Sequence, residues 1–345
     1  TTGYSYQYQN IGQTSNKGVE LQLDAIVVDA KDFGLNFNFN ISYNRGKIDK
    51  LNGSSFWQSS SWAGTAAAGI EDFLVEEGGR LGEVYGYKTD GFYTANDFTF
   101  DAEKGTYALK EGVNDCSSLI GGKVYPGSIK LKANEDGEYK KERLGNTVPT
   151  VSGGFGLNAR WKGFDFTAFF NYSLGNKIVN ATKLGSSFYS GSSKNWNIND
   201  HFTSASRYSW IDSSTGTNLL SSASIKANGE AWTINRLNEI NSNASIWNPA
   251  AATVMPLVDW AVEDGSFLRV NNITIGYTLP KLLVNKLNIQ NIRIYVTGYN
   301  LHCFTKYSGT DPEVDCCTST PMTPGIDYAA YPKSRSFVGG INVTF

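Results

Sequence analysis

Residues 35 to 44 alternate strictly between large apolar and small polar side chains. The segment reads Leu-Asn-Phe-Asn-Phe-Asn-Ile-Ser-Tyr-Asn. Because successive side chains of a strand point to opposite faces, a strand here has one apolar and one polar face. The alternation recurs in at least five further segments, whose polar positions are rich in Asn, Ser, Thr and Gly. This repetition indicates the wall of a membrane-spanning β-barrel, with lipid outside and water inside.

Seven segments carry the alternation clearly. They cover residues 17–28, 35–44, 147–161, 164–171, 272–279, 292–297 and 337–345. Weaker patterns near 82–93 and 126–133 predict two more strands, which makes about nine antiparallel strands in an all-β fold. The apolar positions carry no charge, whereas the polar positions carry both signs. A soluble antiparallel sheet would favour Lys and Glu on its polar face, so a soluble all-β domain is the weaker interpretation.

The connections between these segments alternate in length. Short ones cover residues 29–33, 162–163 and 280–290, and long ones cover 51–147, 176–264 and 306–332. Barrels of the bacterial outer membrane have short periplasmic turns and long extracellular loops, and we expect the same orientation here. Within the second long connection, the spacing of Ile234, Leu237 and Ile240 predicts a short surface helix.

An odd number of antiparallel strands leaves two sheet edges unpaired. In lipid each orphaned backbone group costs several kcal/mol, and bacterial single-chain barrels have even strand counts. We therefore expect the chain to close against strands that lie elsewhere. The sequence shows no signal peptide and starts within a patterned region, so we expect a piece of a longer precursor.

Composition argues against several classes of protein. No apolar run approaches the roughly 18 residues of a membrane-spanning helix. The net charge of −2 argues against a nucleic-acid partner, which usually requires a basic face. With two His in the chain, we expect neither a metal site nor a catalytic site based on histidine, and no cofactor. The acidic pairs 76–77 and 135–136 are chain neighbours, which does not place two carboxylates across a cleft. We expect no enzyme.

The four cysteines are Cys116, Cys303, Cys316 and Cys317, and none has the spacing of a zinc site. In an envelope compartment cysteines can form disulfides. Two interpretations stay open. Either one cysteine of the adjacent pair reaches Cys303 across the last long connection, or these are unpaired residues in loops.

Several stretches, in their order and spacing, carry a resemblance that covers nearly the whole chain. They are 9–12 (Gln-Asn-Ile-Gly), 16–21 (Asn-Lys-Gly-Val-Glu-Leu), 85–92 (Tyr-Gly-Tyr-Lys-Thr-Asp-Gly-Phe), 263–280 (beginning Glu-Asp-Gly-Ser-Phe-Leu-Arg), 297–301 (Thr-Gly-Tyr-Asn-Leu), 311–314 (Asp-Pro-Glu-Val) and 324–332 (Pro-Gly-Ile-Asp-Tyr-Ala-Ala-Tyr-Pro). The chain resembles the C-terminal part of the SusC/RagA family of TonB-dependent outer-membrane transporters.

This resemblance implies that residues 1–345 are the C-terminal part of a barrel of 22 strands. It also implies a plug domain and a TonB-contact segment upstream, and a SusD-like surface lipoprotein that covers the extracellular loops. Such a pair imports oligosaccharides or peptides, driven through TonB. Phe345 is similar to the C-terminal aromatic residue by which the barrel-assembly machinery recognises its clients.

The sequence departs from the family at one point. Members often carry an acidic Asp-x-Asn-x-Asp-Gly run that resembles a calcium loop, whereas residues 132–140 here read Lys-Ala-Asn-Glu-Asp-Gly-Glu-Tyr-Lys. Lysines stand where the outer carboxylates would be, which removes hard oxygen ligands for calcium. A solvated turn without metal is the prediction.

Candidate cargo contacts come from two groups of residues. Seven of the eight Trp lie in long connections, and exposed rings there can stack on sugars; the alternative is that they form small cores that stiffen the loops. Polar positions of the strands supply charged and aromatic groups that either line the path, pair with one another or hold the plug. The candidates are Trp57, Trp62, Arg160, Arg293, Tyr295 and Tyr299. Trp161 ends a strand and suits an interfacial aromatic girdle.

Other functions are a passive porin or an autotransporter-type barrel, which need neither plug nor lid. A secreted carbohydrate-binding β-domain is favoured only by the Trp residues of the loops.

Overall fold

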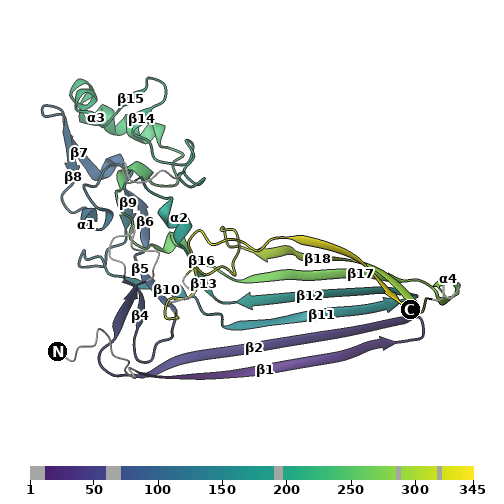
Figure 1. The fold of residues 1–345 in the computed structure, drawn as a ribbon. Helices are drawn as coiled ribbons and strands as arrows, with labels where there is room; N and C mark the ends of the chain where they lie inside the picture. Colours follow the sequence, from purple (N-terminus) through teal and green to yellow (C-terminus); the bar gives the residue numbers. More distant parts are fainter. Residues whose placement is uncertain (1–11, 60–70, 190–196, 285–288, 317–320) are drawn as a thin grey trace, which may run out of the picture.

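The computed structural model describes residues 12–59, 71–189, 197–284, 289–316 and 321–345. Two parts are visible in Figure 1: a sheet of long strands, and a folded mass at one end of those strands. We call the first the wall and the second the cap. The alternating segments form the wall, and the long connections form the cap.

The wall is one antiparallel sheet in the order β1-β2-β11-β12-β17-β18-β20. Its strands are β1 (Gly12–Asp29), β2 (Phe33–Leu51), β11 (Val151–Trp161), β12 (Phe164–Leu174), β17 (Phe267–Thr278), β18 (Asn291–Thr305) and β20 (Ser336–Thr344). Each strand pairs with the next wall strand along the chain. All seven clear sequence patterns are therefore confirmed as wall strands.

The count of about nine wall strands is wrong, because the described residues form a wall of seven strands. Residues 82–93 and 126–133 form short strands of the cap instead: β5 (Glu83–Gly86), β6 (Thr89–Phe92) and β9 (Ile129–Leu131). β6 pairs with β9, and β5 lies between β4 (Glu71–Val75) and β10 (Glu142–Asn146) in a separate sheet. Both segments bury apolar side chains in the core of the cap, so they lack the two-faced alternation of wall strands.

Strand register places the apolar side chains of the alternating pattern on one face of the wall, and Phe169 and Val338 are exceptions that lie on the polar face. Phe39, Phe155 and Phe170 lie side by side on β2, β11 and β12. Further along the sheet, Ile275 pairs with Val296 and both stay more than half exposed, at 56% and 55%. No second layer covers this face in the described part of the chain. The wall is therefore not half of a soluble sandwich.

The short-turn end of the apolar face carries a band of aromatic residues. Trp161 is the register partner of both Phe33 and Phe164, and Phe164 is the partner of Tyr277. The 11 residues of β11 span roughly 25–30 Å of height at the tilt usual for barrel strands, which matches an apolar membrane band. The place expected for Trp161 in an interfacial girdle is consistent with this geometry.

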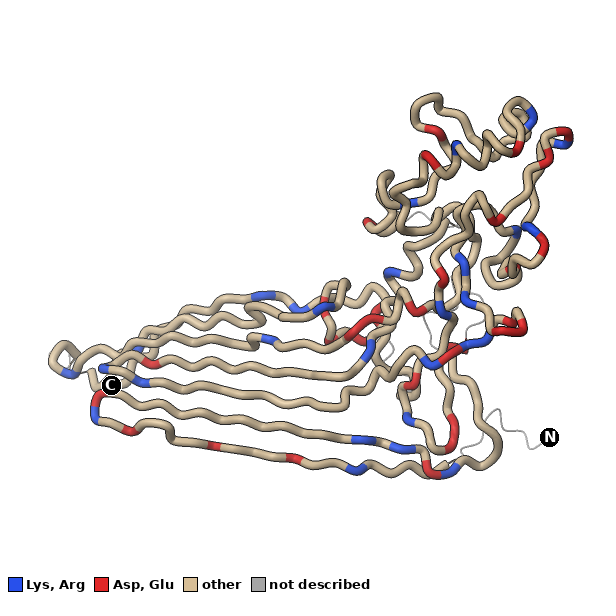
Figure 2. Tube along the Cα trace, turned by 180° about the vertical axis from the view of Figure 1, so that it is seen from behind, with Lys and Arg blue, Asp and Glu red and all other residues tan. Residues whose placement is uncertain are grey.

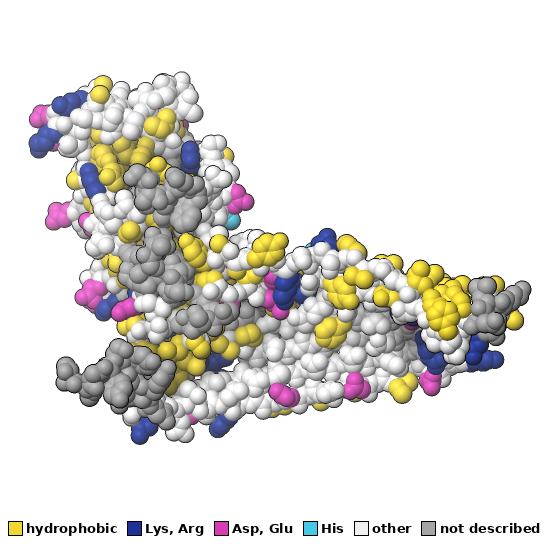
Figure 3. Space-filling view, in the orientation of Figure 1, with side chains coloured by type: hydrophobic (Ala, Val, Ile, Leu, Met, Phe, Trp, Pro, Cys, Tyr) yellow, Lys and Arg dark blue, Asp and Glu magenta, His cyan; other side chains and the backbone are white. Residues whose placement is uncertain are grey.

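The polar face is lined by Asn, Ser, Thr and Gly. Figure 3 shows this face over β2, β11 and β12 as an almost continuous white surface. In Figure 2 the wall strands run through long uncharged stretches, and charges gather in the cap and at the strand ends.

All three short connections lie at one end of the wall, and all three long ones lie at the other, as the sequence predicts. The long connections share one apolar core, whose members come from residues 73–131, 179–261 and 326. The cap strands are β3 (Phe56–Ser59), β4 (Glu71–Val75), β7 (Phe98–Asp101), β8 (Thr106–Leu109), β10 (Glu142–Asn146), β13 (Lys177–Asn180), β14 (Ile211–Asp212), β15 (Thr217–Asn218), β16 (Val262–Asp264) and β19 (Ile326–Asp327).

Helices are few. They are α1 (Ser117–Ile120), α2 (Ala181–Gly185) and α3 (Ser222–Ile240) in the cap, α4 (Lys281–Val284) in the last short connection, and 3-10 turns at Ala95–Asp97, Pro249–Ala251 and Asp259–Ala261. Gly229 kinks α3 at a φ of 78°, so a second helical segment starts near Glu230. The helix expected there is confirmed. Among the described residues, no helix is both long enough and apolar enough to cross a bilayer.

Candidate functional site

Long side chains on the polar face lie flat across glycines of neighbouring strands. Arg293 donates to Asp165 through Nε (2.9 Å) and Nη2 (2.5 Å), and this ion pair covers Gly276. A Cβ on Gly276 would stand 2.5 Å from Asp165 Oδ1. The ring of Tyr295 covers Gly340 in the same way, at 2.6 Å from the position of a Cβ. Because glycine has no Cβ at these two positions, the long side chains of the neighbouring strands can lie flat against the polar face of the wall.

Of the predicted candidates, Arg160, Arg293 and Tyr295 lie toward the short-turn end of the wall. Arg160 forms an ion pair with Asp29, and the Arg293 guanidinium lies 4.9 Å from the Tyr295 ring. Tyr299 lies higher on β18, opposite Asn272, with 41% of its surface exposed. The structure thus joins Arg293 with Tyr295 and keeps Arg160 and Tyr299 apart from them.

Trp57 lies on β3 of the cap, with its ring edge-on to Tyr85 at 5.6 Å and Lys141 Nζ 5.1 Å from the ring centroid. It is 38% exposed. Trp62 lies outside the described residues, as does Trp196.

Three other Trp of the long connections stiffen the cap. Trp247 is buried, donates Nε1–H to the Ser187 carbonyl, and packs edge-on against Trp260 at 5.0 Å. Trp210 donates to the Pro126 carbonyl. For these three residues, the interpretation as small loop cores holds.

We call the place where cap and wall meet the mouth. A pocket of about 590 Å³ opens there on the polar face, between wall residues such as Asn40 and Asn171 and cap residues such as Glu313. Within the described chain, the side-chain oxygen of Asn171 has no hydrogen-bond partner, although it is shielded from solvent. The pocket thus combines polar wall groups with an acidic cap segment.

A buried ion-pair cluster holds that cap segment against the wall. Arg269 of β17 is 4% exposed and bonds Asp311 (2.5 Å) and Glu313 (2.6 Å), and Lys333 also reaches Glu313 (2.8 Å). Sequence reasoning missed this cluster, although its residues fall in the stretches 263–280 and 311–314 that carry the family resemblance. The signal in the sequence was that one of these stretches carries Arg269 and the other carries Asp311 and Glu313, which are groups of opposite charge.

A second polar cluster ties together the connections that follow β12 and β18. Glu263 accepts hydrogen bonds from Ser308 N (2.8 Å), Ser308 Oγ (2.7 Å) and Asn180 Nδ2 (3.1 Å), and Lys183 Nζ lies 3.1 Å away. Burial alone would raise the pKa of Glu263, but the bonds from Ser308 and the charge of Lys183 hold the pKa below its ordinary value.

We expect Glu263→Gln to lower the melting temperature of the full-length protein at pH 7, because an ionised Glu263 is what its partners stabilise. A folded-state pKa below the unfolded value adds stability above an unfolded pKa of about 4.3, and this gain is lost as the pH falls through the folded-state value. The difference in melting temperature should therefore shrink toward pH 4 and below. If the melting temperatures of the variant and the wild type differed by the same amount at pH 7 and at pH 4, Glu263 would not be stabilised in its ionised form.

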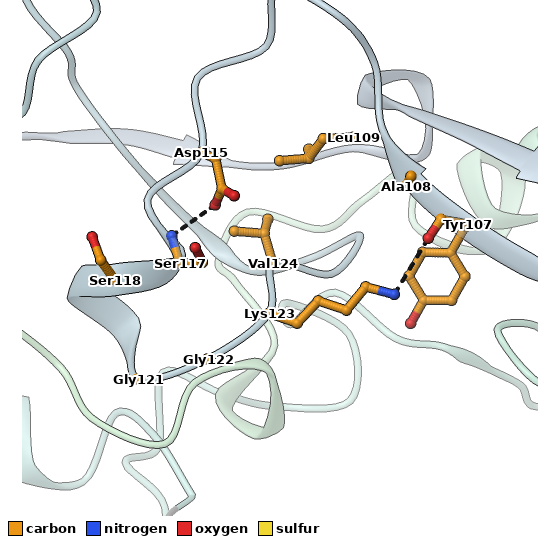
Figure 4. Close-up of a pocket in the computed structure, with 10 residues that line it drawn as sticks. All are labelled: Tyr107, Ala108, Leu109, Asp115, Ser117, Ser118, Gly121, Gly122, Lys123 and Val124. Carbon is orange, nitrogen blue, oxygen red and sulfur yellow. Dashed lines mark hydrogen bonds between the residues drawn. The ribbon is translucent and has the colours of Figure 1, made fainter.

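Farther from the wall, the cap holds an open pocket of about 500 Å³ beside α1. Figure 4 shows Lys123 reaching toward Tyr107, where Nζ donates to the Tyr107 carbonyl (3.3 Å), and Asp115 accepting from Ser117 N (2.8 Å). The Lys123 ammonium also lies 4.1 Å from the Tyr107 ring centroid. Lys123 and Asp115, the two charged residues of this pocket, thus already form hydrogen bonds with other residues that line it.

Two remaining sequence questions concern the turn at 134–138 and the cysteines. Asn134 Oδ1 accepts from Asp136 N and Glu138 N, which makes a local turn with exposed carboxylates, as predicted for a solvated turn. Cys116 and Cys303 are free thiols, so the structure does not contain the pairing considered for Cys303. Cys317 lies outside the described residues.

Comparison with known proteins shows that the chain is similar to TonB-dependent receptors. No protein-family model matches it. It is 29% identical to the TonB-dependent receptor P3 of Formosa agariphila, over all of this chain and 30% of the relative. It is 23% identical to the TonB-dependent receptor SusC of Bacteroides thetaiotaomicron, over 98% of this chain and 27% of the relative. The chain thus spans about a third or less of the curated relatives it matches.

The fold is similar to solved structures of the RagAB peptide importer. The closed-closed state matches with a TM-score of 0.63 and the open-open state with 0.57, each at 23% identity over the whole of this chain. This chain covers 31% of the matched chain of the closed-closed structure. The wall is accordingly part of a larger β-barrel.

Proposed function

We propose that this chain, as a member of the SusC/RagA family of TonB-dependent outer-membrane transporters, forms the wall and the cap of an active nutrient importer. The cargo is an oligosaccharide or a peptide. The observation that carries the proposal is the uncovered apolar face, which register keeps continuous across seven strands. An apolar surface of that extent supports contact with lipid on its outside.

The partners follow from the same premise. Residues 1–345 serve as the C-terminal part of the barrel domain, and the edge strands β1 and β20 pair with the remaining strands of the barrel. A plug domain fills the lumen and receives energy through TonB. The cap faces the cell exterior, where a SusD-like lipoprotein covers it. Phe345, which is exposed at the short-turn end, acts as the assembly signal.

Cargo would meet the six candidate residues in sequence. Trp57 belongs to the cap, and Tyr299 lies on the polar face of β18. Trp62 stays a candidate from the sequence alone, because it lies outside the described residues. Arg160, Arg293 and Tyr295 stand near the exit end. Replacing each with Ala in the full-length transporter and measuring cargo uptake tests each role separately.

The deciding experiment is deletion of the full-length gene in its host. We expect growth to fail on one class of oligosaccharide or peptide as the sole nutrient, to persist on monosaccharides and amino acids, and to return with the intact gene. Removal of TonB should give the same defect. Uptake that survives removal of TonB would indicate a passive porin, and protein released without detergent would indicate a secreted domain.

A further inference from the structure

The short-turn end of the wall presents lysines beside the aromatic band. The turns at residues 30–32 and 162–163 are joined by a hydrogen bond from Lys162 N to the Asp32 carbonyl (3.1 Å), and Thr278 N donates to the Gly163 carbonyl (2.8 Å). Between them lies a pocket of about 420 Å³ that includes Lys31 and Lys162. We call this surface the rim; it is formed by the first two short connections and the end of β17.

Some charged side chains at the rim form ion pairs with one another, and others do not. Arg160 pairs with Asp29, and Asp165 pairs with Arg293. Neither Lys31 nor Lys162 has a carboxylate within ion-pair distance among the described residues, although Asp32 belongs to the same pocket. Two exposed ammonium groups thus stand at the rim, and no described carboxylate forms an ion pair with either of them.

The position of Lys162 points its charge to the lipid side. Its Nζ lies 5.8 Å from the ring centroid of Trp161, a residue of the apolar face that is 54% exposed. The Trp161 ring stacks with Phe164 at 6.3 Å. Aromatic bands mark the depth of lipid headgroups, and lysines beside them extend their amines into the headgroup layer.

The backbone at Lys162 gives an independent indication. Lys162 and Gly163 have φ values of 45° and 91°, as in the two-residue hairpin turn that favours Asn followed by Gly. A lysine is disfavoured in this left-handed conformation because of its Cβ, whereas Asn tolerates it. A lysine at this position therefore contributes something other than the turn itself.

We propose that Lys31 and Lys162 bind the phosphate of a glycerophospholipid in the leaflet at the short-turn end. The ammonium groups contact the phosphate oxygens, while Trp161 and Phe164 pack against the upper acyl chains. This site fixes the height of the wall in the membrane and is separate from cargo import. It rests on the apolar face being in lipid.

Titration of phosphatidylglycerol into the detergent-solubilised full-length protein, followed by native mass spectrometry, tests the proposal. We expect Lys162→Asn and Lys31→Asn each to weaken retention of one lipid about fivefold, and about 25-fold together, since each lysine near a lipid surface contributes a factor of that size. Lys162→Arg should retain the lipid. The melting temperature of Lys162→Asn should not fall, because Asn suits the turn.

Lys110→Asn in the cap is the matched control, and its lipid retention should equal that of the wild type. Equal retention in the double variant and the wild type would overturn the proposal. Displacement of the lipid by millimolar inorganic phosphate would also overturn it, because the site would then be one for free phosphate. A loss of retention in the Lys110 control would assign the effect to overall charge and overturn it as well.

Discussion

Replacing Arg269 with Met should release the cap segment of residues 306–335 from the wall and lower the free energy of unfolding by about 3–5 kcal/mol. The substitution leaves Asp311, which is 3% exposed, without a cationic side chain as its partner in the described chain. An uncompensated buried carboxylate is among the largest single destabilising effects. Trypsin should then cut the folded full-length protein after Lys306 or Lys333, and mass mapping of the fragments would show it.

A matched control is Lys104→Met, because the ion pair of Lys104 with Asp101 is exposed. Its loss should leave the free energy of unfolding nearly unchanged, because solvent screens an exposed ion pair. Arg269→Lys should lie between wild type and Met, since an ammonium keeps the charge but not the two-pronged geometry. If Arg269→Met leaves both the unfolding free energy and the trypsin pattern unchanged, the cluster does not hold the segment.

Replacing Leu157 with Arg should destabilise the full-length protein in lipid by about 2–4 kcal/mol. Leu157 lies near the middle of β11 on the apolar face, between Phe37 and Ala168. A guanidinium there must either lose its hydration or distort the bilayer to keep it. The midpoint of urea unfolding in lipid vesicles, with an unchanged slope, measures the effect.

The control is Asn36→Arg on the neighbouring strand. Asn36 is exposed on the polar face, where it is the register partner of Asn158. An arginine there reaches water, so its cost should stay near zero. Similar losses for both variants would show that the two faces do not differ in solvent, and the assignment of the apolar face to lipid would fail.

Sequence alone predicts the wall because each wall strand alternates between apolar and polar side chains with a period of two residues. In residues 35–43 of β2 the large apolar side chains lie on one face of the wall and each Asn lies on the other, so the pattern is visible without knowing any partner. The short connections follow directly from where the alternation stops. The wall strands β11 and β12 are accordingly predicted almost to their ends.

The cap and the mouth could not be predicted in this way. Thr89 donates both N–H and Oγ–H to Asp259, 170 residues later in the chain. Such contacts leave no period in the sequence. The short strand β9 is buried at Ile129 and Leu131, and the apolar residues of these segments pack into the core of the cap rather than onto one face of the wall. The two weak patterns there were therefore assigned to the wall, and the Arg269 cluster was missed.

The shared core of the cap has a consequence for how specificity can change. Phe73, Leu237 and Ile326 belong to one buried cluster, yet each comes from a different long connection. Exchange of one connection for that of another importer would leave apolar surface from the other two exposed. New specificities should then arise by substitution at exposed tips such as the β7–β8 and β14–β15 hairpins, or by inheritance of all three connections as a set.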